Sequence, residues 1–233
     1  MITSAERQEI SVDFGNDHPG DVVTLYSDET PLIGFRIHQF KSDQRQLPAK
    51  LTTVDYPDVD PTMPVKKVVM SGMDESVMID GKKFQMDRID YTMPMGKCQL
   101  WDVSNANQMH GGMIHPFHMH GCAFQIVSRN GHEPYPFEHG LNDTVAVNPG
   151  EHVLIKVYFR VPGVFMYHCH IIEHEDGGMM AQLKVVDPRE PNKQYHLLSH
   201  HTIMMAFAQE RGVPMDKLWL GGMQSYQKMG MHM

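Results

Sequence analysis

Six histidines, one cysteine and one methionine are concentrated within or shortly after two short segments of the chain. The first segment reads His-Pro-Phe-His-Met-His-Gly over 115–121, and the second reads His-Cys-His over 168–170. His174 and Met179 follow the second segment closely. Imidazole, thiolate and thioether groups are the ligands that copper and other borderline metals prefer in proteins. The two segments therefore predict a metal site.

The second segment divides its donor groups between the two sides of a strand. Side chains of an extended strand point to opposite faces in turn, so His168 and His170 share one face and Cys169 points to the other. A cysteine with two histidines and a weakly bound methionine is the ligand set of a blue copper electron-transfer site. His174 and Met179 follow on a loop, from which they can fold back onto the Cys169 side.

The first segment repeats this division. His118 and His120 are two residues apart and share a face. His115 precedes a proline, which forces an extended or turn conformation and leaves His115 available to complete the Cys169 set. Zinc fits these residues less well, because structural zinc takes four firmly held Cys and His ligands and has no use for an axial methionine.

Both motifs resemble those of a known family. HPFHMHG and HCHIIEHEDGGMM are similar to the third and fourth copper motifs of the multicopper oxidases, in particular of bacterial laccases and cuprous oxidases. The resemblance implies a type 1 copper with His115, Cys169 and His174 as ligands and Met179 as the axial ligand. Met180 is expected to face away from Met179 and to belong to the core.

The resemblance also assigns the remaining motif residues to the trinuclear copper site at which the family reduces oxygen. His118 matches the type 2 ligand of that site. The matches to its type 3 ligands are His120, His168 and His170. Glu175 matches the acid that the family places near the oxygen site as a proton relay, and Glu173 is the alternative. His168, Cys169, His170 and Glu175 are therefore the residues expected to carry electrons and protons.

The sequence supplies half of the trinuclear ligand set. The family uses eight histidines, four of which come from two His-x-His motifs in its first domain. Outside 115–121 and 168–170 the chain has no His-x-His pair. The other four histidines are expected from an N-terminal cupredoxin domain of the same enzyme, either as a separate chain or as sequence missing from this one.

Two functions of different class are compatible with these motifs. The first is an oxidoreductase that takes single electrons from a small reducing substrate at a type 1 copper and reduces O2 to water at a trinuclear cluster. The second is a blue copper electron carrier without oxygen chemistry, in which His118 and His120 would have no use. The sequence leaves the reducing substrate open among phenols, aromatic amines, bilirubin-like pigments and cuprous ion.

The segments around the motifs predict an all-β fold. Glycine (19 residues) and proline (15 residues) are frequent, and short alternating stretches recur between 65 and 187. Asn130-Gly131 marks a hairpin turn, and the alternation within 153–160 predicts a half-buried strand. Seven or eight such strands fit a cupredoxin-like Greek-key β-sandwich, which would hold all the copper ligands.

Three further segments flank the predicted domain 65–187. Residues 1–40 contain short strand-like pieces, including 9–14, and the family resemblance implies that they are the end of a second, partial cupredoxin domain. Residues 41–64 are polar with four prolines and predict a linker. Residues 188–233 form a C-terminal extension, in which 199–211 predicts one short helix.

Composition excludes several classes of partner and context. The formal net charge of −8 argues against nucleic acid and anionic membranes. No apolar run reaches the roughly 18 residues of a membrane span. Three cysteines do not make a disulfide framework. The first residues lack the basic and apolar regions of a signal peptide, which favours a cytoplasmic location without deciding the compartment.

Overall fold

The computed structural model describes residues 2–39, 48–106 and 112–195, together with a few positions between 197 and 214. Two compact units are present. One consists of the residues up to Glu6 and those from Tyr56 onward, and the other is Arg7–Asp55. Within the described part of the chain, no helix is both long and apolar enough to cross a membrane.

The described residues of the smaller unit contain one hairpin. β1 (Val22–Ser27) pairs antiparallel with β2 (Thr30–Arg36), and Asp28 in the turn adopts a φ of 49°. The alternating segment 9–14 forms no strand, contrary to its pattern. Alternation alone does not make a strand, because a strand also needs a neighbour that accepts its hydrogen bonds.

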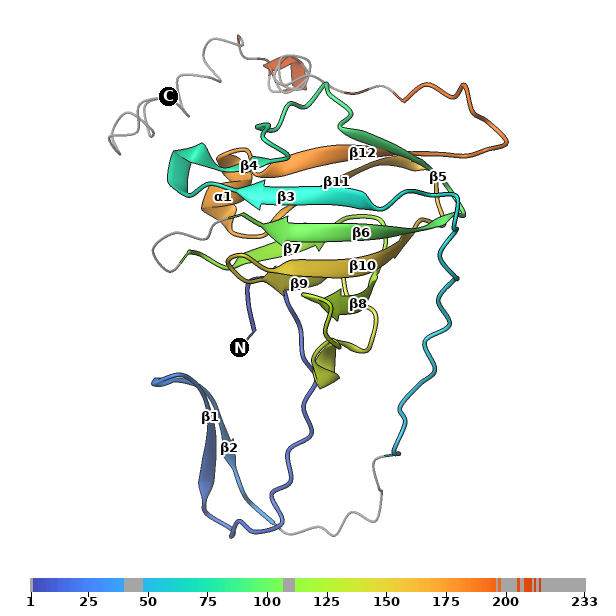
Figure 1. Ribbon diagram of the computed structural model, residues 1–233. Helices are drawn as coiled ribbons and strands as arrows, with labels where there is room; N and C mark the ends of the chain where they lie inside the picture. Colours follow the sequence, from blue (N-terminus) through green and yellow to red (C-terminus); the bar gives the residue numbers. More distant parts are fainter. Residues whose placement is uncertain are drawn as a thin grey trace. The chain divides into compact units, whose positions relative to one another are not determined.

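The larger unit is a sandwich of two five-stranded sheets that pack face to face (Figure 1). The first sheet has the order β4-β3-β6-β10-β8, with β3 (Lys66–Ser71), β4 (Met78–Ile79), β6 (Cys98–Asn105), β8 (Gln125–Arg129) and β10 (His152–Tyr158). The second has the order β5-β12-β11-β7-β9, with β5 (Tyr91–Pro94), β7 (His115–Met119), β9 (Thr144–Val147), β11 (Gly163–Cys169) and β12 (Met180–Val186). Three short helical segments complete the described elements, namely η1 (Asp74–Ser76), η2 (Pro136–Glu138) and α1 (Ile172–Asp176).

The all-β class predicted from the sequence is confirmed, with ten strands in the described part of this unit instead of seven or eight. β4 has only two residues, so an alternation of apolar and polar residues cannot reveal it in the sequence. β10 shows the predicted alternation, because Val153, Ile155 and Val157 are fully buried and their neighbours are not. The Asn130-Gly131 turn is also present, with positive φ at both residues and a bridge between the flanking residues 129 and 132.

Aromatic side chains join the two sheets. Trp101 of β6 meets Tyr167 of β11 edge to face, with ring centroids 5.3 Å apart, and both side chains are fully buried. Phe117 of β7 lies 6.1 Å from the Tyr167 ring. Because Phe117 lies within the first metal-ligand motif and Tyr167 directly precedes the second, the strands that carry those motifs are anchored by the centre of the core.

Part of the predicted linker lies on the sandwich. The Tyr56 hydroxyl is 3.1 Å from the carbonyl oxygens of Ala123 and Lys156, and the Asp60 N–H donates to the Cys98 carbonyl at 2.8 Å. The helix predicted over 199–211 falls largely outside the described residues, among which Met205 and 208–210 are helical.

Gly121 is a position where the fold requires glycine. It follows His120 with a φ of +78°, and a Cβ built there would lie 2.3 Å from the Phe165 ring. Gly131 has nearly the same φ, +79°, but no atom within 4 Å of such a Cβ. Gly121→Ala is therefore expected to lower the free energy of unfolding by about 3 kcal/mol, from strain plus overpacking. Gly131→Ala carries the strain alone, about 1 kcal/mol. Urea unfolding of both variants measures the difference, and equal losses would contradict the packing argument.

Candidate metal centre

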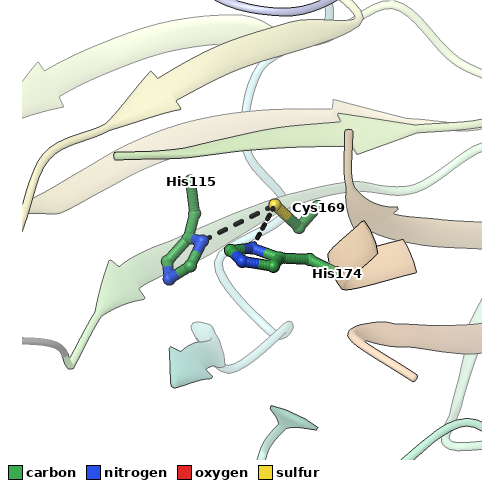
Figure 2. A group of neighbouring side chains, drawn as sticks. All are labelled: His115, Cys169 and His174. Atoms are coloured by element: carbon green, nitrogen blue, oxygen red, sulfur yellow. Dashed lines mark hydrogen bonds between the residues drawn. The ribbon is translucent and has the colours of Figure 1, made fainter. Parts of the chain in front are cut away.

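Three donor side chains meet inside the sandwich (Figure 2). The Cys169 Sγ atom at the end of β11 lies 3.6 Å from His115 Nδ1 and 3.7 Å from His174 Nδ1. His115 begins β7, and His174 belongs to α1. All three residues are buried, with Cys169 and His115 fully so. The predicted His115, Cys169 and His174 are thus brought together.

Strand register explains this meeting. β11 and β7 pair antiparallel, with Cys169 opposite Phe117 and His168 opposite His118. Opposed residues of an antiparallel pair share a face, and so do residues two apart on one strand. Cys169 therefore shares its face with Phe117 and with His115. α1 then returns the chain, so that His174 reaches the same side from 5 residues further along.

The spacing of the three donors fits a bound metal ion. Sulfur at about 2.3 Å and nitrogen at about 2.0 Å from a divalent ion lie about 3.5–3.7 Å apart at tetrahedral or trigonal angles. Both measured separations, 3.6 and 3.7 Å, lie in that range. One sulfur with two imidazoles, remote from water, suits copper better than magnesium or calcium, which take oxygen ligands.

Burial sets the protonation of these donors. It raises the pKa of the Cys169 thiol to about 12. Burial, and then the neighbouring His174, lower the pKa of His115 to about 4, and burial also lowers the pKa of His174. Burial therefore favours the neutral imidazoles, the form that binds a metal, whereas the thiol gives up its proton only when a metal replaces it.

The strand register places Met179 opposite Cys169. The Cys169 N–H donates to the Met179 carbonyl at 3.1 Å, and the next pair in the register is His168 with Met180. Met179 therefore lies on the face of Cys169, and Met180 lies on the face of His168. The Met179 side chain is fully buried in the core.

A second cluster of imidazoles lies on the opposite face of the same two strands. The ligand atoms of His118, His120 and His168 all lie within 4.8 Å of one another, and the two Nε2 atoms of His120 and His168 are 3.1 Å apart. The His170 ring centroid is 5.3 Å from that of His118. His170 Nδ1 is buried and has no hydrogen-bond partner, which is the condition that an added ligand would relieve.

Two rings of this cluster are oriented through their Nδ1 atoms. His118 Nδ1 lies 2.8 Å from the Asp143 carbonyl and 2.9 Å from Thr144 Oγ1. His168 Nδ1 lies 3.0 Å from the Cys169 carbonyl. Since a carbonyl only accepts, these contacts require the proton on Nδ1 of both rings, which leaves each Nε2 as an acceptor or ligand atom. Contacts of this kind orient metal-bound histidines.

Glu175 contacts the second cluster from α1. Its Oε2 atom lies 3.3 Å from His168 Nδ1, and its side chain is 30% exposed. The carboxylate of Glu173 instead acts on the charge of His174. Glu175 therefore links solvent to the imidazole cluster, which Glu173 does not.

Electrostatics in the second cluster favour neutral imidazoles. Burial, and then the charges of His120 and His168, lower the pKa of His118 to about 4. Burial also lowers the pKa of His168. We call His115, Cys169 and His174 the sulfur set. Within the described ranges, the sulfur set and this cluster are the two groups of three or more donors that could hold a metal ion. His110, His196, His200, His201 and His232 lie outside those ranges.

Asp143 and Thr144 were not selected from the sequence as site residues. They stand next to His118 only because β9 pairs with β7, with Thr144 opposite His118. They belong to no sequence motif. The alternation of β9 predicts a strand, but it does not predict which strand pairs with it. The pairing of the two strands is the signal that finds them.

Comparisons with known proteins agree with this geometry. Residues 58–189 match the multicopper oxidase family. The multicopper oxidase mco of Staphylococcus aureus is 37% identical over 184 residues, covering 79% of this chain and 38% of the relative. A laccase of Haloferax volcanii is 31% identical over 208 residues, covering 81% of this chain and 35% of the relative.

The crystal structure of a multi-copper oxidase from Pediococcus acidilactici is similar with a TM-score of 0.77 and 52% identity. It covers 80% of this chain and 39% of that protein. The likeness confirms the cupredoxin-like fold predicted from the sequence. The chain spans about two fifths of the length of these relatives.

Proposed function

Because this chain belongs to the multicopper oxidase family, we propose that it carries the type 1 copper site and half of the trinuclear site of an oxygen-reducing enzyme. The type 1 ligands are His115, Cys169, His174 and, axially, Met179. The type 2 ligand is His118, and the type 3 ligands are His120, His168 and His170. The enzyme takes single electrons from a phenol-like, aromatic amine or cuprous substrate.

One observation carries the proposal. Cys169 Sγ lies within 3.7 Å of two imidazole nitrogens on one face of β11, while the adjacent His168 lies within 3.1 Å of His120 on the other. Bound copper supplies one-electron oxidation at the first set and four-electron reduction of O2 to water at the second. A single peptide unit separates the two sets, so Cys169 and His168 form a short covalent path between them.

Protein groups in this arrangement also handle protons. Glu175 is 30% exposed and contacts His168 Nδ1 at 3.3 Å, so it joins solvent to the oxygen-reducing side. A carboxylate in this position exchanges protons with water and delivers them toward the cluster. His168 in turn is held by its Nδ1 contacts, which keeps its Nε2 directed at His120.

The other four histidines of the trinuclear set come from outside this chain. The chain has two His-x-His pairs, at 118–120 and 168–170, and covers about two fifths of its relatives. An N-terminal cupredoxin domain of the same enzyme is the proposed source. Residues 1–40 are proposed as the end of the second domain, and 65–187 as the third.

The alternative is a blue copper electron carrier that uses only the Cys169 set.

We expect the chain, assembled with an N-terminal part of the family, to consume oxygen with a phenolic donor. His118→Ala should reduce that rate at least about 100-fold while leaving the blue absorption intact, because a cluster ligand is lost and the sulfur set is not. An oxygen electrode and an absorption spectrum measure both. Blue protein that consumes no oxygen before substitution would favour the carrier.

Met179→Leu tests the axial ligand. Loss of a weak sulfur donor destabilises the oxidised state more than the reduced one, so the reduction potential of the blue site should rise. We expect a rise above about 59 mV, a tenfold change in the one-electron equilibrium. Met180→Leu is the matched control, since Met180 lies on the opposite face. Spectroscopic redox titration compares the reduction potentials of the two variants. A rise of the potential only in Met180→Leu would make Met180 the axial ligand in place of Met179.

A further inference from the structure

The strand that orients His118 is short and lies at the edge of its sheet. β9 has 4 residues, Thr144–Val147, and pairs on one side with β7. Its partners on β7 include His115 and His118. A strand of this length at an edge leaves outward N–H and C=O groups unpaired and frays easily. Whatever holds the outer edge of β9 therefore also holds the acceptors of His118.

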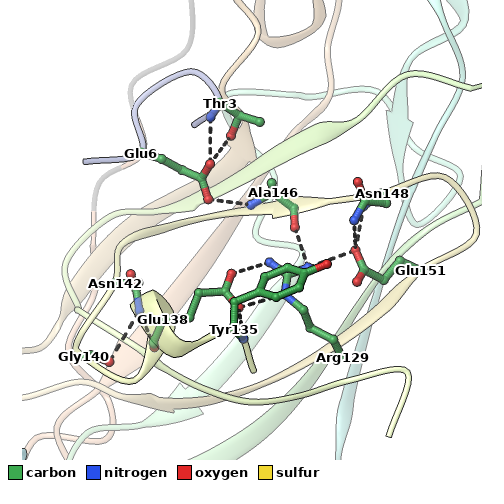
Figure 3. A network of polar contacts seen from close by, with 10 residues as sticks. All are labelled: Thr3, Glu6, Arg129, Tyr135, Glu138, Gly140, Asn142, Ala146, Asn148 and Glu151. Atoms are coloured by element: carbon green, nitrogen blue, oxygen red, sulfur yellow. Dashed lines mark hydrogen bonds and ion pairs between the residues drawn. The ribbon is translucent and has the colours of Figure 1, made fainter. Parts of the chain in front are cut away.

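Two side chains occupy that outer edge (Figure 3). The Ala146 N–H donates to Glu6 Oε1 at 3.0 Å, and the Ala146 carbonyl accepts from Arg129 Nη1 at 3.0 Å. Glu6 is 140 residues away in sequence. A carboxylate and a guanidinium thus replace the neighbouring strand that β9 lacks on this side.

Arg129 is held in place by two acidic side chains. Its Nε donates to Glu138 Oε2 at 2.9 Å, and its Nη1 donates to Glu151 Oε2 at 2.9 Å. All three side chains are at most 8% exposed. Glu6 is fixed in its turn, because its Oε2 accepts from the backbone N–H and the hydroxyl of Thr3. The network is therefore rigid on both sides of Ala146, and we name Glu6, Arg129, Glu138 and Glu151 the β9 clamp.

We infer that Glu6 is a positioning residue for His118, acting through the β9 clamp. His118 Nδ1 finds its acceptors at Asp143 and Thr144, three and two positions before Ala146. When the outer edge of β9 is released, this end of the strand frays, and the His118 ring loses the contacts that select its Nδ1–H tautomer. The inference rests on the proposed role of His118 as a copper ligand.

The test uses Glu6 in place of Arg129, because removing the arginine would leave Glu138 and Glu151 buried without a counter-charge and could unfold the protein. Glu6→Ala removes the acceptor of the Ala146 N–H. Glu6→Gln keeps one acceptor oxygen, which can face the Ala146 N–H, and loses the acceptor for Thr3 together with the charge. Asp60→Ala is the control for loss of a surface carboxylate, since Asp60 bonds Thr62 and Lys97 elsewhere.

The full chain is studied without metal, with 15N-labelled histidine and amide hydrogen exchange read out by NMR. In Glu6→Ala we expect exchange of the Ala146 amide to quicken about tenfold, and the His118 15N shifts to move toward a mixture of tautomers. Glu6→Gln should restore both, and Asp60→Ala should change neither.

Two outcomes would overturn the inference. One is faster exchange at Ala146 with His118 shifts unchanged, which would make Glu6 an edge cap without influence on the ring. The other is no change at either position. Neither outcome bears on copper binding, so the proposed function would still be judged separately by the blue absorption and by oxygen uptake.

Discussion

Cys169→Ser is expected to abolish the blue absorption of the copper-loaded protein completely. The blue colour of such sites comes from charge transfer between a thiolate and copper held by two imidazoles with a weak axial donor. In the proposed site Cys169, which lies next to His115 and His174, supplies the thiolate, and serine offers no comparable ligand. Absorption and electron paramagnetic resonance spectra of copper-loaded wild type and variant give the result.

The other two cysteines are the matched controls. Cys98 is buried in β6 of the other sheet, and Cys122 Sγ lies 3.3 Å from Met119 Sδ, outside the sulfur set. Cys98→Ser and Cys122→Ser should therefore keep the blue band at full intensity. A Cys169→Ser protein that is still blue would remove Cys169 from the site, and loss of the band in a control would assign the thiolate elsewhere.

The division of ligands into two sets could be predicted from the sequence, for a simple reason. Side chains of a strand alternate with a period of two, and the motif His168-Cys169-His170 lies at the end of a strand. Whatever partners the strand has, Cys169 and His168 must face opposite ways. The pairing of His168 with His118 and of Cys169 with Phe117 then brings the first motif into the same arrangement.

The residues that orient the ligands could not be predicted in this way. Thr144 reaches His118 across 26 residues, and Glu6 reaches Ala146 across 140. Such contacts depend on which strands become neighbours, and a single sequence does not state that order. The contact of Asp143 with His118 Nδ1 is made by its backbone carbonyl, which any residue would supply.

Short or weakly patterned elements also escape sequence reasoning. β4 has two residues, so no periodicity can mark it. The segment 9–14 alternates well and still forms no strand, since alternation describes a face and not the presence of a neighbour. In contrast, β10 alternates over seven residues and packs three fully buried side chains, so pattern and packing agree there.

The 233-residue chain alone is expected to bind one copper tightly and not to reduce oxygen to water at a laccase-like rate. Its second cluster offers His118, His120 and His168 within 4.8 Å, with His170 adjacent, and the family uses eight histidines. The buried Nδ1 of His170 has no hydrogen-bond partner in the described structure. Outside 118–120 and 168–170 the sequence has no His-x-His pair to complete the set.

Reconstitution tests this count directly. Copper per chain, by native mass spectrometry, and oxygen consumption with a phenolic donor are measured for the chain alone and with an N-terminal cupredoxin part added. Addition should raise the copper content toward four and start oxygen consumption. A symmetric dimer of the chain would bring together two identical half-sets, whereas the family joins halves with different motifs, so dimerisation alone should not restore turnover. If the isolated monomer holds four coppers and turns over like a laccase, the half-set argument is wrong.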